Sequence, residues 1–268
     1  MSAPQNRAWA KGRSQSRVLL PAVMDRLPAD ELAPRQLMTL APPYTEFSQS
    51  ICRDPRMRPM PGSIVLGIGG ASIIAALYEL TVAAMEWPWV IPCLVANDGG
   101  DSLARLPMLI ADLRDRLVIV KALPARGENR MTKILDAARR RPPPNAQVLA
   151  RWISRRVGVS DLEPFLLAQF REALEGSPAT TTASVATFCR HFARLGPYTP
   201  RHWRALARFC ASATCTHVTS AGVRDRLSSR LLADHARKFL GMTPRELNAR
   251  VGWEWVAEGA LRVAGYII

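Results

Sequence analysis

Basic and small polar side chains recur at helical spacing in the last third of the chain. In residues 184–196 (SVATFCRHFARLG) they fall on one stripe, which consists of Ala186, Thr187, Arg190, His191 and Arg194. Arg side chains can contact phosphate oxygens, while Thr187, His191 and Arg190 can reach base edges in a major groove. The chemistry that these residue types offer is therefore recognition of a nucleic acid.

A second basic stripe lies in residues 229–241 (SRLLADHARKFLG). Its members are Arg230, Asp234, Arg237 and Lys238. Asp234 would repel phosphate, and it could accept a hydrogen bond only from an amino group such as that of cytosine. We expect base-specific contacts mainly from the first stripe and phosphate contacts mainly from the second.

Apolar residues opposite the two stripes predict the helices that position them. In the first helix the apolar stripe consists of Val185, Phe188, Cys189, Phe192 and Leu195, and in the second of Leu232, Ala236, Phe239 and Leu240. A helix over 160–176 precedes the first, and a connecting helix over 199–213 carries Trp203, Leu206, Phe209 and Cys210 inward. Ser228 is placed to cap the second helix. Two helices joined by a short turn, with a basic outer face, form a helix-turn-helix.

The chain repeats one phrase. RHFARLGPYTPRHW (190–203) and DHARKFLGMTPREL (234–247) share a basic amphipathic stretch, a glycine, Thr-Pro and a further helix, with Gly196 and Gly241 45 residues apart. Residues 181–268 carry 13 Lys and Arg residues and five acidic residues, a net charge of +8 out of +14 for the whole chain. A positive excess of this kind attracts polyanions.

These motifs resemble the double helix-turn-helix domain of the AraC/XylS family over residues 160–250. The residues that carry the resemblance are Ser184, Phe188, Arg190, Phe192, Gly196, Thr199, Pro200 and Trp203 in the first unit, and Ser228, Leu232, Ala236, Gly241, Thr243 and Pro244 in the second. Asp234 stands where the family usually has Arg. The resemblance implies a transcription regulator that contacts double-stranded DNA through Ser184, Ala186, Thr187, Arg190, His191, Arg194, Ser228, Arg230, Asp234, Arg237 and Lys238. A homodimer and RNA polymerase are further expected partners.

Residues 62–141 alternate between short apolar runs and amphipathic stretches. Runs at 89–96 and 117–122 predict buried strands, while 101–116 and 128–141 predict helices. The stretch 63–85 predicts a strand, a Gly-rich turn and a helix. The result is a small parallel α/β domain, which resembles the later half of a response-regulator receiver through Lys121 and Pro124. Asp98 alone cannot form the acidic pocket of that family, so we expect no phosphorylation of the usual kind.

Proline-rich segments set the predicted boundaries. Residues 1–61 are a basic arm followed by an irregular segment with one or two short helices, and 62–141 are the α/β regulatory domain. The sequence RRRPPP (139–144) opens a stiff, solvated linker. Residues 142–159 are then linker and connecting helix, and 160–268 are the double helix-turn-helix domain.

Alternative interpretations remain for several segments. Residues 63–85 approach the length of a membrane span, although Glu79 interrupts them. The motif Gly67-x-Gly69-x-x-Ser72 could serve a nucleotide-binding enzyme, and the apolar terminal stretch 252–268 an adaptor protein. Cys189, His191, Cys210, Cys215 and His217 have irregular spacing for zinc. We expect a cytoplasmic protein that is not an enzyme, with no metal, cofactor or membrane partner.

Overall fold

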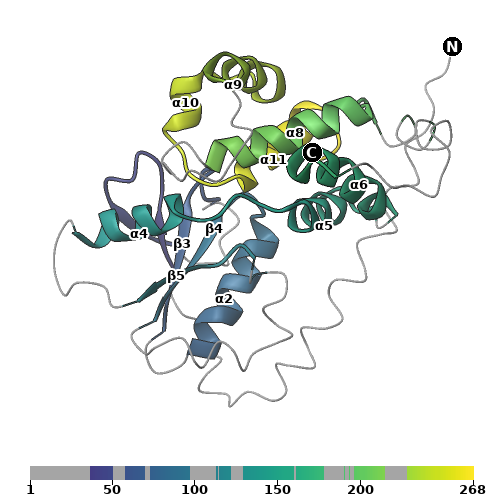
Figure 1. Cartoon of the computed structure of the whole chain (residues 1–268). Coiled ribbons are helices and arrows are strands. Elements are labelled where there is room, and N and C mark those ends of the chain that lie inside the picture. Colours follow the sequence, from purple (N-terminus) through teal and green to yellow (C-terminus); the bar gives the residue numbers. More distant parts are fainter. Residues whose placement is uncertain are drawn as a thin grey trace, which may run out of the picture.

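The computed structural model describes residues 37–50, 58–69, 73–96, 113, 115–121, 129–159, 161–177, 190, 193, 196–214 and 228–268. Within these ranges the chain forms an α/β region followed by a helical part (Figure 1). The predicted combination of an α/β region with a C-terminal helical region is thus confirmed.

Three parallel strands form the centre of the α/β region. These strands are β3 (Ile64–Gly69), β4 (Ile91–Ala96) and β5 (Val118–Lys121). They are covered on one face by helix α2 (Ile73–Glu86) and on the other by α4 (Asn129–Arg139). Because most residues on both faces are buried, with Ile68 and Ile119 as exposed exceptions, these strands read as continuous apolar runs, which is why the sequence identifies them.

An antiparallel hairpin extends this sheet and corrects the sequence prediction. Strands β1 (Leu37–Leu40) and β2 (Phe47–Ser50) lie in the segment expected to be irregular, and the strand order is β2-β1-β3-β4-β5. The sheet is therefore mixed rather than purely parallel. The strands have only four residues each, and the two prolines at 42 and 43 lie in the turn between them. Short strands beside prolines give too weak a periodic signal to be read from the sequence.

The turn of this hairpin is attached to the far end of the chain. Tyr44 has a φ of 68°, which is unusual for a residue with a side chain. Its hydroxyl donates to the Gly62 carbonyl at 2.8 Å and accepts from the Val251 amide at 3.0 Å. Burial raises the pKa of Tyr44 to about 12, so the hydroxyl keeps its proton for these two hydrogen bonds.

The helices predicted over 160–176, 199–213 and 229–241 are confirmed in the helical part. This part contains α5 (Ala146–Val157), α6 (Leu162–Glu175), α8 (Pro200–Thr214), α9 (Ser229–His235), the π-helical turn η5 (Ala236–Leu240), α10 (Pro244–Asn248) and α11 (Glu254–Val263). Asn145 caps α5, and Gly158 and Gly176 end α5 and α6 in the left-handed conformation. The four residues predicted to face inward from the connecting helix α8 are all buried.

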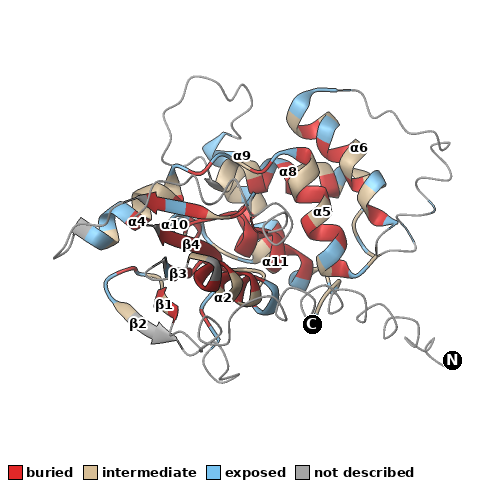
Figure 2. Ribbon diagram, turned by 90° about the horizontal axis from the view of Figure 1, so that it is seen from below, coloured by how far each residue is buried: buried red, intermediate tan, exposed pale blue. Residues whose placement is uncertain are grey.

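Helix α11 lies at the junction between the two regions (Figure 2). Trp253, Trp255, Val256 and Leu261 are buried there, so the apolar surface considered for an adaptor is used mainly in the core. Val263, also expected on that apolar face, is instead 61% exposed.

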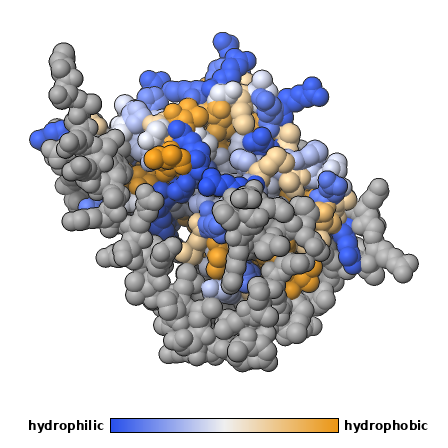
Figure 3. All heavy atoms as spheres, turned by 180° about the vertical axis from the view of Figure 1, so that it is seen from behind, coloured by the Kyte–Doolittle hydropathy of each residue, from blue (hydrophilic) through white to orange (hydrophobic). Residues whose placement is uncertain are grey.

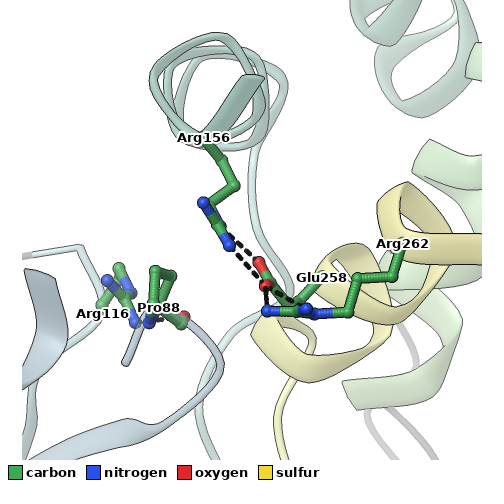
Figure 4. A network of polar contacts seen from close by, with 5 residues as sticks. All are labelled: Pro88, Arg116, Arg156, Glu258 and Arg262. Carbon is green, nitrogen blue, oxygen red and sulfur yellow. Dashed lines mark hydrogen bonds and ion pairs between the residues drawn. The ribbon is translucent and has the colours of Figure 1, made fainter. Parts of the chain in front are cut away.

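Two buried carboxylates on α11 face arginines from distant segments. Glu254, fully buried, is 2.6 Å from Arg141 and 3.6 Å from Arg116, whose guanidinium also donates to the carbonyls of Pro88 and Val90. Glu258 lies between Arg156 of α5 and Arg262 (Figure 4), and its bonds to Arg156 are 2.6 and 2.8 Å long. These pairs attach α11 to both regions.

The segment expected to be a solvated linker is partly packed. Arg141 is only 8% exposed and Pro144 is buried, although Arg140 and Pro142 are exposed. The reason is electrostatic, because a buried carboxylate such as that of Glu254 requires a nearby positive charge. A run of charges in the sequence does not reveal which of its members will have a buried partner.

The segment 63–85 forms the predicted strand and helix, β3 and α2, so a continuous membrane-spanning helix over these residues is wrong. Gly67 allows close contact between them, since a Cβ atom there would lie 2.9 Å from Leu80 Cδ1. Among the helices of the described residues, none combines the length and apolar composition needed to cross a bilayer.

Candidate nucleic-acid interface

The helix formed by α9 and η5 is defined by strong signals at both ends. Ser228 precedes it in an extended conformation, and its hydroxyl accepts a hydrogen bond from the Leu231 amide at 3.3 Å. Gly241 ends it with a φ of 65°, and the Met242 amide reaches back to the Ala236 carbonyl. The Gly241 amide also donates to the Arg237 carbonyl at 3.0 Å, which is the hydrogen bond of an αL cap. The predicted capping role of Ser228 is confirmed.

The two sides of this helix differ in burial as the sequence predicted. Ala236 and Phe239 are buried. The outward residues, here called the α9 face, are exposed: Arg230, Leu231, Asp234, Arg237 and Lys238. The carboxylate of Asp234 and the guanidinium of Arg237 are 4.0 Å apart and both largely exposed, so their attraction is weak in water.

An aromatic cluster holds this helix on α8. Phe239 stacks on Phe209 with ring centroids 5.9 Å apart, and Tyr198 meets Phe239 edge to face at 5.7 Å. His235 lies beside both phenylalanine rings. Since these rings connect the α9 face to the buried core, the face is presented on a rigid support.

Arg201 of α8 extends the positive surface and was missed by the sequence prediction, and His202 follows it on the same helix. Partial burial, together with the charges of Lys238 and Arg201, lowers the pKa of His202. Burial and then the Lys238 charge also lower the pKa of His235. The sequence signal that could have identified Arg201 is its position directly after Thr199-Pro200. In the second copy of the repeat, Arg245 occupies the equivalent position after Thr243-Pro244.

The duplicated Thr-Pro phrase has the same local structure in both copies. At Thr243 the amide donates to the Glu246 carboxylate at 2.8 Å, and the Glu246 amide donates back to the Thr243 hydroxyl at 3.4 Å. At Thr199 the amide donates to His202 Nδ1 at 3.2 Å, and the His202 amide donates to the Thr199 hydroxyl at 3.4 Å. The arrangement at Thr243 is a capping box, and the arrangement at Thr199 is its counterpart with histidine in place of glutamate.

Several other basic side chains are held by contacts inside the protein. Arg204 of α8 makes two hydrogen bonds to Glu172 of α6, and Arg208 donates to the Ala173 carbonyl. Arg250 lies over the ring of Trp255 and Arg262 over that of Trp89. The exposed positive charges at the candidate interface are those of the α9 face, Arg201 and Arg245. Among them, the Lys238 ammonium lies 5.8 Å from the centroid of the Phe239 ring and remains exposed. Hydrophilic atoms dominate the upper rim of the surface in Figure 3, the end at which α9 and α10 lie in Figure 1.

The first predicted stripe falls largely outside the described residues. Ser184, Ala186, Thr187, His191 and Arg194 are in this group, together with most of the helix expected over 184–196. Arg190, its one described member, is helical and exposed, and position 193 is also helical. The inward residues Val185, Phe188, Cys189, Phe192 and Leu195 likewise lie outside the described part of the chain.

The described residues contain no group of three or more His, Cys, Asp or Glu side chains suited to a metal ion. Cys210 is buried in the helical core, while the other four residues of the zinc alternative are not described. Lys121 ends β5, whereas Asp98 and Pro124 of the receiver resemblance, and residues 70–72 of the Gly-rich turn, lie outside the described ranges.

Comparisons with protein-family models, with curated proteins and with solved structures found no match to this chain.

Proposed function

We propose that this protein is a sequence-specific DNA-binding transcription regulator with two helix-turn-helix units. The observation that carries the proposal is the α9 face. Its basic residues are exposed, whereas Ala236 and Phe239 of the same helix are buried, and the helix is capped at both ends and supported by α8. A helix with these properties suits the major groove of a duplex.

The repeated structure supports the proposal further. Both copies have a glycine with positive φ, then a threonine cap and a proline at the start of the next helix. Two such units on one face of a duplex favour an offset of one helical turn, so their footprints would be centred about 10 bp apart. Arg190 of the first unit contacts base edges in this proposal, while Arg230 and Lys238 of the second contact phosphates.

The test is a titration of the full chain on duplex DNA at several salt concentrations. Each phosphate contact contributes about −0.9 to the slope of log K against log salt. Lys238→Ala should reduce the steepness by about one and weaken binding to all sequences alike. Arg190→Ala should cost about 1–3 kcal/mol on a selected site and relax sequence preference.

The matched control is Arg171→Ala, which removes an exposed arginine from α6, outside the α9 face. This variant should bind DNA as the unaltered protein does. If the unaltered protein shows no salt-dependent binding to any duplex, the proposed function is wrong. If Arg171→Ala changes the slope as much as Lys238→Ala, binding depends on overall charge and not on the α9 face.

A further inference from the structure

Leu231 is the apolar member of the otherwise charged α9 face. Its side chain is 48% exposed, whereas the neighbouring Leu232 is partly buried and packs against the helical core. The Leu231 amide is already held by the Ser228 cap. Neither the core nor the cap therefore accounts for a leucine side chain at this position.

The position of Leu231 places it among the residues proposed to face DNA. Residues three or four apart on a helix are neighbours, so Asp234 is next to both Leu231 and Arg230. All three side chains are exposed, and all belong to the first two turns of α9. The N-terminal turns are the part of a recognition helix that contacts base edges in the major groove.

Base edges offer one apolar group to a side chain of this kind. In the major groove, thymine presents a C5-methyl group, whereas the other edges are hydrogen-bond donors and acceptors. A leucine side chain cannot form a favourable contact with a charged phosphate. Its contact with a methyl group is favourable, because it removes apolar surface of both groups from water. Asp234 beside it can accept from the amino group of cytosine. The α9 face therefore combines one apolar and one acidic contact within a single turn of helix.

We propose that Leu231 is a specificity residue that recognises the C5-methyl group of a thymine in the half-site bound by α9. The inference rests on the proposed DNA-binding function and adds to it the identity of one base. A contact with a single methyl group corresponds to about a fourfold difference in affinity.

The test replaces thymine with uracil, which removes only the methyl group. Duplexes bound by the full chain are first selected from a library with a randomised centre. Each thymine of the selected site is then replaced in turn by deoxyuridine, and the affinity is measured. We expect one position at which the unaltered protein binds about fourfold more weakly, and at which Leu231→Ala shows no difference between the two bases.

Arg171→Ala is the matched control, because it alters an exposed residue outside the α9 face and keeps Leu231. It should keep the full difference between thymine and uracil. Arg230→Ala, which removes a proposed phosphate contact, should weaken binding to both duplexes alike and keep their ratio. The inference is overturned if the selected site contains no thymine, if no position responds to uracil, or if Leu231→Ala keeps the response. Each of these results leaves salt-dependent DNA binding intact, so they are distinct from failure of the proposed function itself.

Discussion

His202 takes part in the N-terminal cap of α8, and its protonation is affected by nearby positive charges. Its Nδ1 accepts a hydrogen bond from the Thr199 amide, which requires that this nitrogen carry no proton. Lys238 and Arg201 add positive charge nearby, and together with partial burial they lower the pKa of His202. The neutral ring is thus favoured both by the cap and by its surroundings.

We predict that acid destabilises the first cap and that His202→Gln relieves part of this effect. A lowered pKa means that the folded state binds fewer protons than the unfolded chain, in which histidine titrates at about 6.5. This contribution to stability is complete above that value and is lost as the pH falls through the lowered pKa. Glutamine keeps an acceptor for the Thr199 amide but does not titrate.

The measurement is the Tm of both proteins at a neutral and a mildly acidic pH. The unaltered protein should lose more Tm than His202→Gln. An equal loss in the two proteins would show that the cap does not depend on the protonation of His202.

Among the elements, the two copies of the repeat differ in what surrounds their glycines. Gly241 ends η5 with φ 65° and has open space where a Cβ atom would lie. Gly196 has φ 145°, and a Cβ atom there would lie 2.5 Å from the Tyr266 ring. The glycine of the repeated motif is therefore required for its backbone conformation alone at position 241, and for both its conformation and its small size at position 196.

Alanine at the two glycines should consequently have unequal effects. Gly241→Ala introduces backbone strain only, with an expected cost of about 1–2 kcal/mol in the free energy of unfolding. Gly196→Ala adds a steric clash to an unfavourable φ and should cost clearly more. Urea denaturation of both variants gives the comparison, and Gly241→Asn, which tolerates this conformation, should cost least. Equal costs at the two positions would mean that Tyr266 moves aside freely.

The elements also show how far the sequence could predict this structure. Helices α5, α6 and α8 and the inward residues of α9 follow from hydrophobic periodicity, and the parallel strands follow from their apolar runs. Strands β1 and β2 could not be predicted, because each has only four residues and prolines 42 and 43 lie between them, so the segment resembles a loop. The α9 face was predicted in orientation, but the contribution of Arg201 and His202 depends on the packing of α8 against η5. That packing becomes visible only in three dimensions.

At the scale of the whole molecule, ion pairs between distant segments attach α11 to the α/β region, through Arg141 and Glu254, and to α5, through Arg156 and Glu258. Arg141 and Glu254 are 113 residues apart in the chain, and Arg156 and Glu258 are 102 apart. Neither pair has a local sequence signature. Because Glu254 is completely buried, its charge depends on the arginines that face it.

Removing one partner of the buried pair should be far more damaging than removing one partner of an exposed pair. Arg141→Ala leaves Glu254 with only the longer contact to Arg116, and we expect a cost of up to about 3–5 kcal/mol in the free energy of unfolding. Glu172→Ala breaks the half-exposed pair with Arg204, where about 0.2–1 kcal/mol is typical of a solvated pair.

Chemical denaturation of the two variants and of the unaltered chain provides the measurement. Similar costs for Arg141→Ala and Glu172→Ala would contradict the importance assigned to burial. The double variant Arg141→Met with Glu254→Gln is informative as well, because it removes both charges and should recover part of the loss.

Helix α11 also determines when the chain can complete its fold during synthesis. Arg116, Arg141 and Arg156 leave the ribosome well before Glu254 and Glu258, and the Tyr44 hydroxyl precedes its partner at Val251 by 207 residues. Until Glu254 emerges, the buried guanidinium of Arg141 lacks the carboxylate with which it pairs in the folded protein. The α/β region, which is synthesised first, therefore completes its buried contacts only after α11 has emerged. A nascent chain halted before residue 254 would therefore be an incompletely folded substrate for chaperones and proteases.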